Sequence, residues 1–284
     1  MVLQQVSKIG DIVSPTTLAS IVYHNIFEYP LSSGELIKWE VSPKLIKPYH
    51  LPKDIGYQKG FYFINGQEGL LLKRALRKRL SEKKQLIAKK SVRILSLIPW
   101  ITGVFLTGSV AMGNAKEEGD IDLMIIVKSG RLWTSRLLSF LLLTASGFKM
   151  RRHGIVDQKD RLCMNMWLDE SSLVWPEKER NIFSAHEIIQ VKPLLNRRNV
   201  YERFLSENIW VKDYWPSSIS INKRENTAIR VQAGRIEKML FNLQHKYMKD
   251  KITKEIVRED RAIFHPTDLW PEILRQLRGK GFKL

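Results

Sequence analysis

The chain has 284 residues, and its 47 lysines and arginines against 29 aspartates and glutamates give a formal net charge of +18. Hydrophobic residues make up 44% and charged residues 27%, which excludes a wholly disordered chain and indicates a folded one. The excess positive charge favours a polyanionic partner, either nucleic acid, nucleotide phosphates or an anionic membrane surface. Cys163 is the only cysteine, which excludes an intrachain disulfide and a cysteine-rich zinc site.

The sequence shows neither a signal peptide nor an apolar segment long enough to span a membrane. The amino terminus has no basic segment followed by an apolar one, so we expect no signal peptide. The most apolar run, around Leu137–Leu143, is too short to span a bilayer. We therefore expect a soluble cytoplasmic protein, whose oligomeric state the sequence leaves open.

Residues 1–66 are predicted to form a small helical unit closed by a strand pair. A first helix must end at Tyr29-Pro30, a second begins at the capping-box pattern Ser32–Glu35, and Ser42-Pro43 marks a third start. Residues 56–66, which contain Phe61–Ile64 and end in Asn-Gly, are predicted to form a β-ribbon. Three helices followed by a ribbon resemble a winged helix, for which DNA binding and a structural or protein-contact role both stay open.

Residues 67–98 are predicted to form one long basic helix. Apolar side chains recur at helical spacing at Leu72, Leu76, Leu80, Ile87 and Ile94. The other face carries Lys73, Arg74, Arg77, Lys78, Arg79, Lys83, Lys84, Lys89, Lys90 and Arg93. Exposed helix faces ordinarily mix both signs, but Glu82 is the only acid between Lys73 and Arg93. This helix therefore predicts contact with a phosphate backbone, RNA before DNA, with a membrane surface as the weaker alternative.

Residues 99–175 predict a small mixed α/β sheet. Strand-like runs lie at 101–107, 121–127 and 162–168, and an apolar helix pattern covers 131–146. Residues 176–284 are predicted to be mainly helical, with helices near 181–190, 201–210, 224–249 and 267–278. The expected fold is thus α/β (α+β), a small mixed sheet flanked by the winged-helix-like unit and a helical carboxy-terminal region.

The first of these strands leads into a Gly108-Ser109 turn, and the second begins with Asp120-Ile121-Asp122. A glycine turn before a helix lets unpaired backbone N–H groups and the Ser109 hydroxyl hold phosphate oxygens. Asp120 and Asp122 are two residues apart on a strand, so their carboxylates share one face and repel each other. A divalent cation relieves this repulsion, and carboxylate and phosphate oxygens are the ligands that Mg²⁺ prefers.

A Gly-Ser turn, a short spacer and Asp-x-Asp within strand–helix–strand resemble the signature of the DNA polymerase β-type nucleotidyltransferase superfamily. The flanking regions also resemble those of uncharacterised bacterial proteins that carry such a domain. The resemblance implies that Gly108 and Ser109 hold the triphosphate of an NTP, and that Asp120 and Asp122 bind Mg²⁺ or Mn²⁺. It also implies in-line transfer of a nucleoside monophosphate to a hydroxyl, with release of pyrophosphate.

One part of the family's site is not evident in this sequence. Members usually carry a third carboxylate on a later strand, and the matching strand offers Asn165 at its centre. Asp160 before the strand or Asp169 after it are the alternatives. Cys163 on this strand is interpreted as an inert core thiol.

The sequence therefore predicts a metal-dependent nucleotidyltransferase, with RNA ranked first as acceptor and protein or a small molecule after it. The alternative is a catalytically weak domain that acts as a nucleotide- or nucleic-acid-binding regulator or an antitoxin-like protein. The third carboxylate separates the two interpretations, because an enzyme needs an acid close to Asp120 and Asp122, whereas a binding protein does not.

Overall fold

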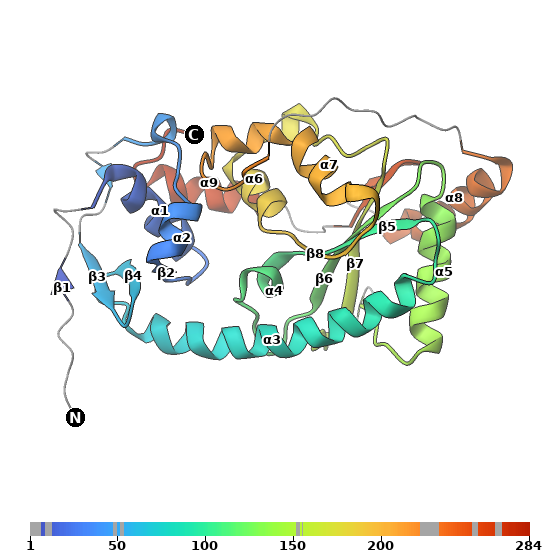
Figure 1. Ribbon diagram of the computed structural model, residues 1–284, viewed down its shortest axis with the longest axis horizontal. Coiled ribbons are helices and arrows are strands. Elements are labelled where there is room, and N and C mark those ends of the chain that lie inside the picture. Colours follow the sequence, from blue (N-terminus) through green and yellow to red (C-terminus); the bar gives the residue numbers. More distant parts are fainter. Residues whose placement is uncertain are drawn as a thin grey trace.

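The protein has a mixed α/β architecture built on two sheets that lie at different ends of a long helix (Figure 1). The computed structural model describes residues 13–47, 50–51, 54–151, 154, 156–221, 233–251, 255–264 and 269–284, and the strand at 7–8. No helix within these residues has both the length and the apolar character needed to cross a membrane.

The amino-terminal elements follow the predicted order of short helices and a ribbon. Ser14 caps the first helix by accepting a hydrogen bond from the Thr17 N–H, and Ser32 and Glu35 form the predicted capping box of the second. The small antiparallel sheet has the order β1-β3-β4-β2. Its elements are β1 (Ser7–Lys8), α1 (Pro15–Asn25), β2 (Leu31–Ser32), α2 (Ser33–Lys38), a 3₁₀ turn (Pro43–Leu45), β3 (Ile55–Gln58) and β4 (Phe61–Ile64). The assignment of this unit as a winged helix stays a prediction.

The larger sheet has the order β8-β5-β6-β7-β10-β9 and is mixed, since β6 and β7 run parallel while the other neighbours are antiparallel. Three of its strands are the predicted ones, and the other three come from the region after residue 175 that was predicted as mainly helical. These are short strands toward the sheet edges, where too few residues carry an alternating pattern. The bounds are β5 (Ile101–Leu106), β6 (Ile121–Val127), β7 (Leu162–Asp169), β8 (Lys192–Asn196), β9 (Ile256–Val257) and β10 (Arg261–Ile263).

Helices cover both faces of this sheet, which explains the unbroken apolar run of β6. Ile125 faces a core shared with α3 (Gly69–Leu95), α5 and α8, whereas Met124 and Ile126 face a core shared with α6, α7, α9 and the amino-terminal unit. The predicted helices near 181–190 and 201–210 are present. Those predicted at 224–249 and 267–278 are helical over Arg235–Met248 and Trp270–Arg278, and their residues 224–232 and 267–268 lie outside the described residues. The helices are α4 (Gly108–Met112), α5 (Leu132–Ala145), α6 (Ile182–Ile189), α7 (Val200–Glu207), α8 (Arg235–Met248) and α9 (Trp270–Arg278).

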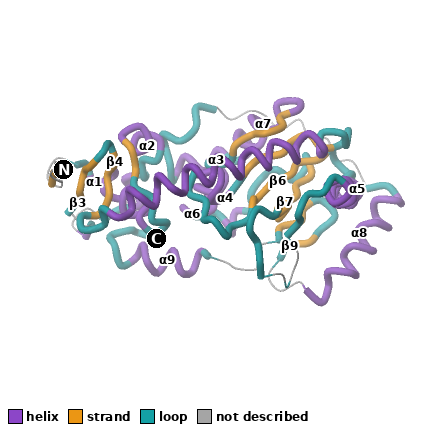
Figure 2. Tube along the Cα trace, turned by 90° about the horizontal axis from the view of Figure 1, so that it is seen from below, coloured by secondary structure: helices purple, strands orange, loops and turns teal. Residues whose placement is uncertain are grey.

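The long helix α3 (Gly69–Leu95) runs from the small sheet to α5, as Figures 1 and 2 both show. Its predicted apolar stripe is wrong at one end, because Leu72 and Leu76 are 74% and 59% exposed. The buried face carries small residues instead, Ser81, Ala88 and Ser91. Small side chains let the helix approach its neighbours closely, and this feature is invisible to a search for large apolar residues.

The basic residues of α3 divide into two groups. Four of them pair with acids outside the helix: Lys73 and Arg77 pair with Glu28, Arg74 pairs with Glu35, and Lys84 pairs with Asp160. The remaining six are exposed and take part in none of the ion pairs formed among the described residues, namely Lys78, Arg79, Lys83, Lys89, Lys90 and Arg93. The first group fastens α3 to the protein, and only the second is available to a partner.

Candidate active site

The turn after β5 is held directly against the start of β6. Gly108 has φ of +61°, a left-handed conformation, and a Cβ placed there would lie 2.7 Å from Asp122 Oδ2. Both observations require glycine, since a side chain would be strained and would also collide with the carboxylate. The Thr107 N–H donates to the Asp122 carbonyl at 3.0 Å and fastens the turn to the strand. Ser109, the next residue, is exposed at the start of α4.

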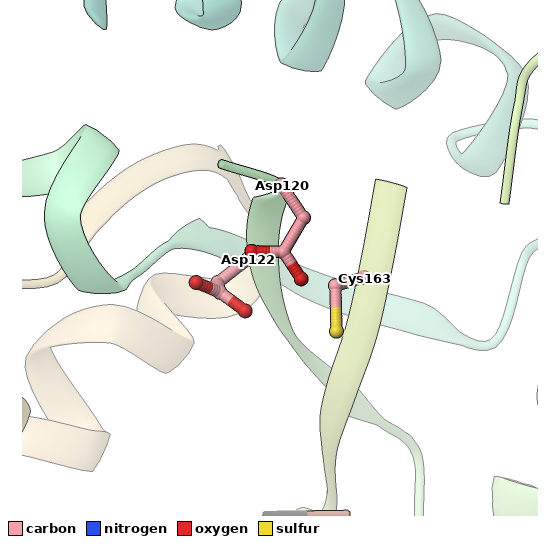
Figure 3. Close-up of side chains that lie close together, drawn as sticks. All are labelled: Asp120, Asp122 and Cys163. Carbon is pink, nitrogen blue, oxygen red and sulfur yellow. The ribbon is translucent and has the colours of Figure 1, made fainter. Parts of the chain in front are cut away.

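Asp120 and Asp122 lie together at the start of β6, with Cys163 on the adjacent strand β7 (Figure 3). One carboxylate oxygen of each aspartate and the Cys163 sulfur all lie within 4.8 Å of one another. The pairing of Asp122 with Cys163 in the β6–β7 ladder places the thiol there. Cys163 is thus a buried thiol, as predicted, but it lies beside the two aspartates, a position that the sequence did not predict. Burial and the two carboxylates raise its pKa well above the ordinary value, so the thiol stays protonated.

Each aspartate has one neighbour that partly offsets its charge. Arg151 Nη1 donates to Asp120 Oδ2 at 2.7 Å, and Asn165 Nδ2 donates to Asp122 Oδ1 at 2.7 Å. Burial, and then the charge of Asp120, nevertheless raises the pKa of Asp122 to about 7, against the opposing effect of Arg151. The pair thus keeps a repulsion that its protein partners do not remove.

The residues fit a divalent cation that prefers oxygen ligands. Asp120 and Asp122 supply carboxylates that repel each other, and Asn165 Oδ1 is buried without a hydrogen-bond partner among the described residues. A protonated thiol is a poor ligand for Mg²⁺, so Cys163 would border the ion without binding it. Asp120, Asp122 and the Asn165 carbonyl are accordingly the residues that would hold Mg²⁺ or Mn²⁺.

The two alternative third carboxylates have other partners. Asp160 Oδ1 accepts a hydrogen bond from Lys84 Nζ at 2.6 Å and is not part of the group around Asp120 and Asp122. Asp169 lies at the far end of β7, where it accepts hydrogen bonds from Ser129 Oγ and the Gly130 N–H. Both carboxylates therefore stabilise loops and leave the third position to another residue.

Lys84 is a structural cation under the loop that leads to Asp120. Its side chain is 2% exposed, and Nζ also donates to the carbonyls of Glu117 and Gly119 at 3.0 and 2.8 Å. We expect Lys84→Met to lower the free energy of unfolding by about 2–4 kcal/mol, since it removes three hydrogen bonds of a buried charge. Urea unfolding measures this change, and the exposed Lys83→Met should leave stability within about 0.5 kcal/mol of wild type.

The same pair tests whether Asp160 belongs to the metal site. We expect Asp160→Asn to keep the Mn²⁺ affinity of the wild type while it loses stability through the weakened Lys84 contact. A tenfold loss of Mn²⁺ affinity in this variant would instead place Asp160 at the aspartate pair.

Sequence reasoning missed Arg151 and Glu187. Glu187, on α6, lines the same small cavity as Gly108, Asp122 and Asn165. Burial raises the pKa of Glu187 to about 7, and its charge contributes to the raised pKa of Asp122. The only sequence signal was one acid within the apolar pattern of residues 182–189, which is too weak to place a residue at a distant strand.

Residues 74–207 match the family model described as a nucleotidyltransferase domain. The match begins within α3, includes the Gly108 turn, Asp120, Asp122 and Asn165, and ends at the last residue of α7. The chain contains a nucleotidyltransferase domain of the polymerase β-like superfamily. Searches among curated proteins and solved structures gave no significant match. The matched residues also include β8, and the predicted domain boundaries stay a prediction.

Proposed function

We propose that this protein transfers a nucleoside monophosphate from an NTP to an acceptor hydroxyl, with Mg²⁺ or Mn²⁺ bound at Asp120 and Asp122. The observation that carries the proposal is the close approach of the Gly108 turn to Asp122, 2.7 Å from a Cβ position to a carboxylate oxygen. Because Gly108 has no side chain, its backbone lies directly beside the Asp122 carboxylate. A triphosphate and its cation need that arrangement, because the phosphates bind to backbone N–H groups and the cation to the acids.

The residues of the site divide the chemistry between them. Gly108 and Ser109 are proposed to hold the phosphates at the start of α4, where Thr107 makes no side-chain capping bond that would compete. Asn165 holds Asp122 in position through its 2.7 Å hydrogen bond. The acceptor oxygen bonds to the α-phosphorus, the bond to the bridging oxygen breaks, and pyrophosphate leaves with that electron pair. The bound cation supplies charge neutralisation at the phosphates.

RNA is the acceptor that we rank first, because α3 exposes six cations that form no ion pair with any described residue. Exposed lysines and arginines in excess over acids bind phosphate backbones and release counterions. Lys83 lies next to Lys84, which holds the loop before Asp120, so a strand bound along α3 would pass close to the site. A protein side chain or a small hydroxyl compound remains as the second class of acceptor.

Two observations favour the alternative function, which is a nucleotide- or nucleic-acid-binding regulator or antitoxin-like protein with little turnover. Arg151 occupies a carboxylate oxygen of Asp120, and an amide stands at position 165 where family members carry an acid. A permanent guanidinium at the aspartates would replace part of the charge of the cation and retain nucleotide binding without efficient transfer.

The acceptor is identified by incubating the full chain with each [α-³²P]NTP, Mg²⁺ or Mn²⁺, and either total bacterial RNA or a protein extract. We expect label in RNA, and we expect Lys83→Gln/Lys90→Gln to bind RNA more weakly and with a salt dependence reduced by about two phosphate contacts. A Glu82→Gln variant on the same helix serves as the control. Label in protein but not in RNA would overturn the RNA assignment, and bound NTP without label in any acceptor would favour the regulator.

A further inference from the structure

A small cavity of about 50 Å³ lies beside the Gly108 turn. Its polar lining residues are Thr107, Asp122, Asn165, Trp175 and Glu187, and its remaining walls are apolar. A volume of this size holds a few water molecules or one hydroxyl-bearing group and is too small for a nucleobase. The cavity therefore has room for a single hydroxyl-bearing group beside the Gly108 turn.

Two buried polar atoms on the cavity walls have no hydrogen-bond partner among the described residues. Asn165, which is 5% exposed, leaves its Oδ1 without a donor, and Trp175 leaves its indole Nε1–H without an acceptor. A buried polar group without a partner costs roughly 1–3 kcal/mol, so such groups in a cavity wall indicate a ligand or water between them. The Trp175 N–H thus offers the cavity a donor for a polar guest, while Asn165 Oδ1 is the atom assigned above to the cation.

Glu187 reaches this cavity from α6, a helix outside the strands that carry the sequence motif. Gln190 Nε2 donates to Glu187 Oε1 at 2.5 Å and fixes the carboxylate, and no described side chain donates to Oε2. Glu187 is absent from the group of ligand atoms within 4.8 Å of one another at Asp120, Asp122 and Cys163. Glu187 borders the cavity with Asp122, and the two aspartates meet each other without it.

We propose that Glu187 is the third carboxylate of this site and accepts the proton of the acceptor hydroxyl. The role rests on the proposed function. As the acceptor oxygen bonds to the α-phosphorus, its proton passes to Glu187 Oε2 and the pyrophosphate leaves; the proton then returns to solvent. If Glu187 is the base, position 165 does not need an acid. Asn165 then has only to hold Asp122 in position and offer its side-chain carbonyl to the cation.

The test compares Glu187→Gln and Glu187→Asp with wild type in transfer of [α-³²P]NTP label to the acceptor that the wild type labels. Glutamine keeps the volume and the Gln190 contact but cannot accept the proton, so we expect transfer to fall on the order of 10²-fold or more. Affinity for Mn²⁺ and NTP, measured by calorimetry, should stay within threefold. Aspartate should restore part of the rate, and Glu177→Gln, an exposed acid before α6, should behave like wild type.

The possible failures are distinguishable. Transfer by Glu187→Gln within threefold of wild type would overturn the base assignment and leave the proposed function intact. A variant that lost Mn²⁺ affinity tenfold would make Glu187 a metal ligand and would also overturn it. Wild-type protein that transfers no label to any acceptor would overturn the proposed function and the role of Glu187 together.

Discussion

Replacement of Asp122 by asparagine is expected to lower transfer on the order of 10³-fold while it stabilises the metal-free protein. Transfer falls because an amide cannot neutralise the cation that the carboxylates hold. Stability rises because the pKa of Asp122 is about 7 in the fold, above the value of about 3.9 for a free aspartate. Ionisation therefore costs the folded state increasingly as pH rises from 4 to 7. At pH 8 in EDTA we expect the variant to gain about 2 kcal/mol in urea unfolding, a value reduced for partial exposure to solvent.

The matched control for this change is Glu118→Gln. Glu118 lies in the same loop, and its side chain is 77% exposed. It should keep both transfer and stability close to those of wild type. If Asp122→Asn lost both transfer and stability, Asp122 would be a structural residue. This result would contradict the claim that charge repulsion at the site destabilises the metal-free protein.

Acid is expected to weaken the contact between the amino-terminal unit and the nucleotidyltransferase core through His24. This histidine on α1 packs against His186 on α6 with ring centroids 5.2 Å apart, and both are buried. Burial lowers the pKa of His24 to about 4, and burial together with His24 lowers that of His186 well below its ordinary value. In the unfolded chain these histidines take up protons near pH 6.5, whereas in the folded protein they stay neutral to lower pH. Their contribution to stability is therefore complete above pH 6.5 and is lost toward pH 4.

The measurement is the free energy of urea unfolding at pH 7 and pH 5 for wild type and His24→Gln. Wild type should lose about 2 kcal/mol more than the variant over this interval, at 1.36 kcal/mol per pH unit between 6.5 and 5. Asp122 and Glu187 act in the opposite direction, because their pKa values near 7 make protonation favourable in the fold. The comparison with His24→Gln removes that contribution, and equal pH dependence of the two proteins would contradict a buried neutral His24.

The parts of the site that the sequence predicted are those that local geometry determines. Gly108 ends a strand, and Asp120 and Asp122 share a face because side chains alternate along β6. Such features need only a few neighbouring residues, and the family match includes all of them. Asn165 was also predicted beside the pair, and its hydrogen bond to Asp122 agrees with the position assigned from the strand pattern.

The residues that were missed depend on contacts between distant segments. Cys163 reaches the aspartates only through the register of β7 on β6, which includes a shift between Asp122 and Met124. Arg151 and Glu187 come from a loop and a helix whose positions follow from tertiary packing. The contact of Asp160 with Lys84 was unforeseen for the same reason, since Lys84 precedes it by 76 residues.

The central claim is that Asp120 and Asp122 hold a divalent cation together with an NTP. Titration of Mn²⁺ into the full chain with ATP, followed by electron paramagnetic resonance of the free ion, tests it most directly. We predict that wild type binds Mn²⁺ and that Asp120→Asn/Asp122→Asn binds it at least tenfold more weakly, with Glu117→Gln/Glu118→Gln as the control of equal charge. Equal Mn²⁺ affinity in wild type and in the aspartate double variant would contradict the account.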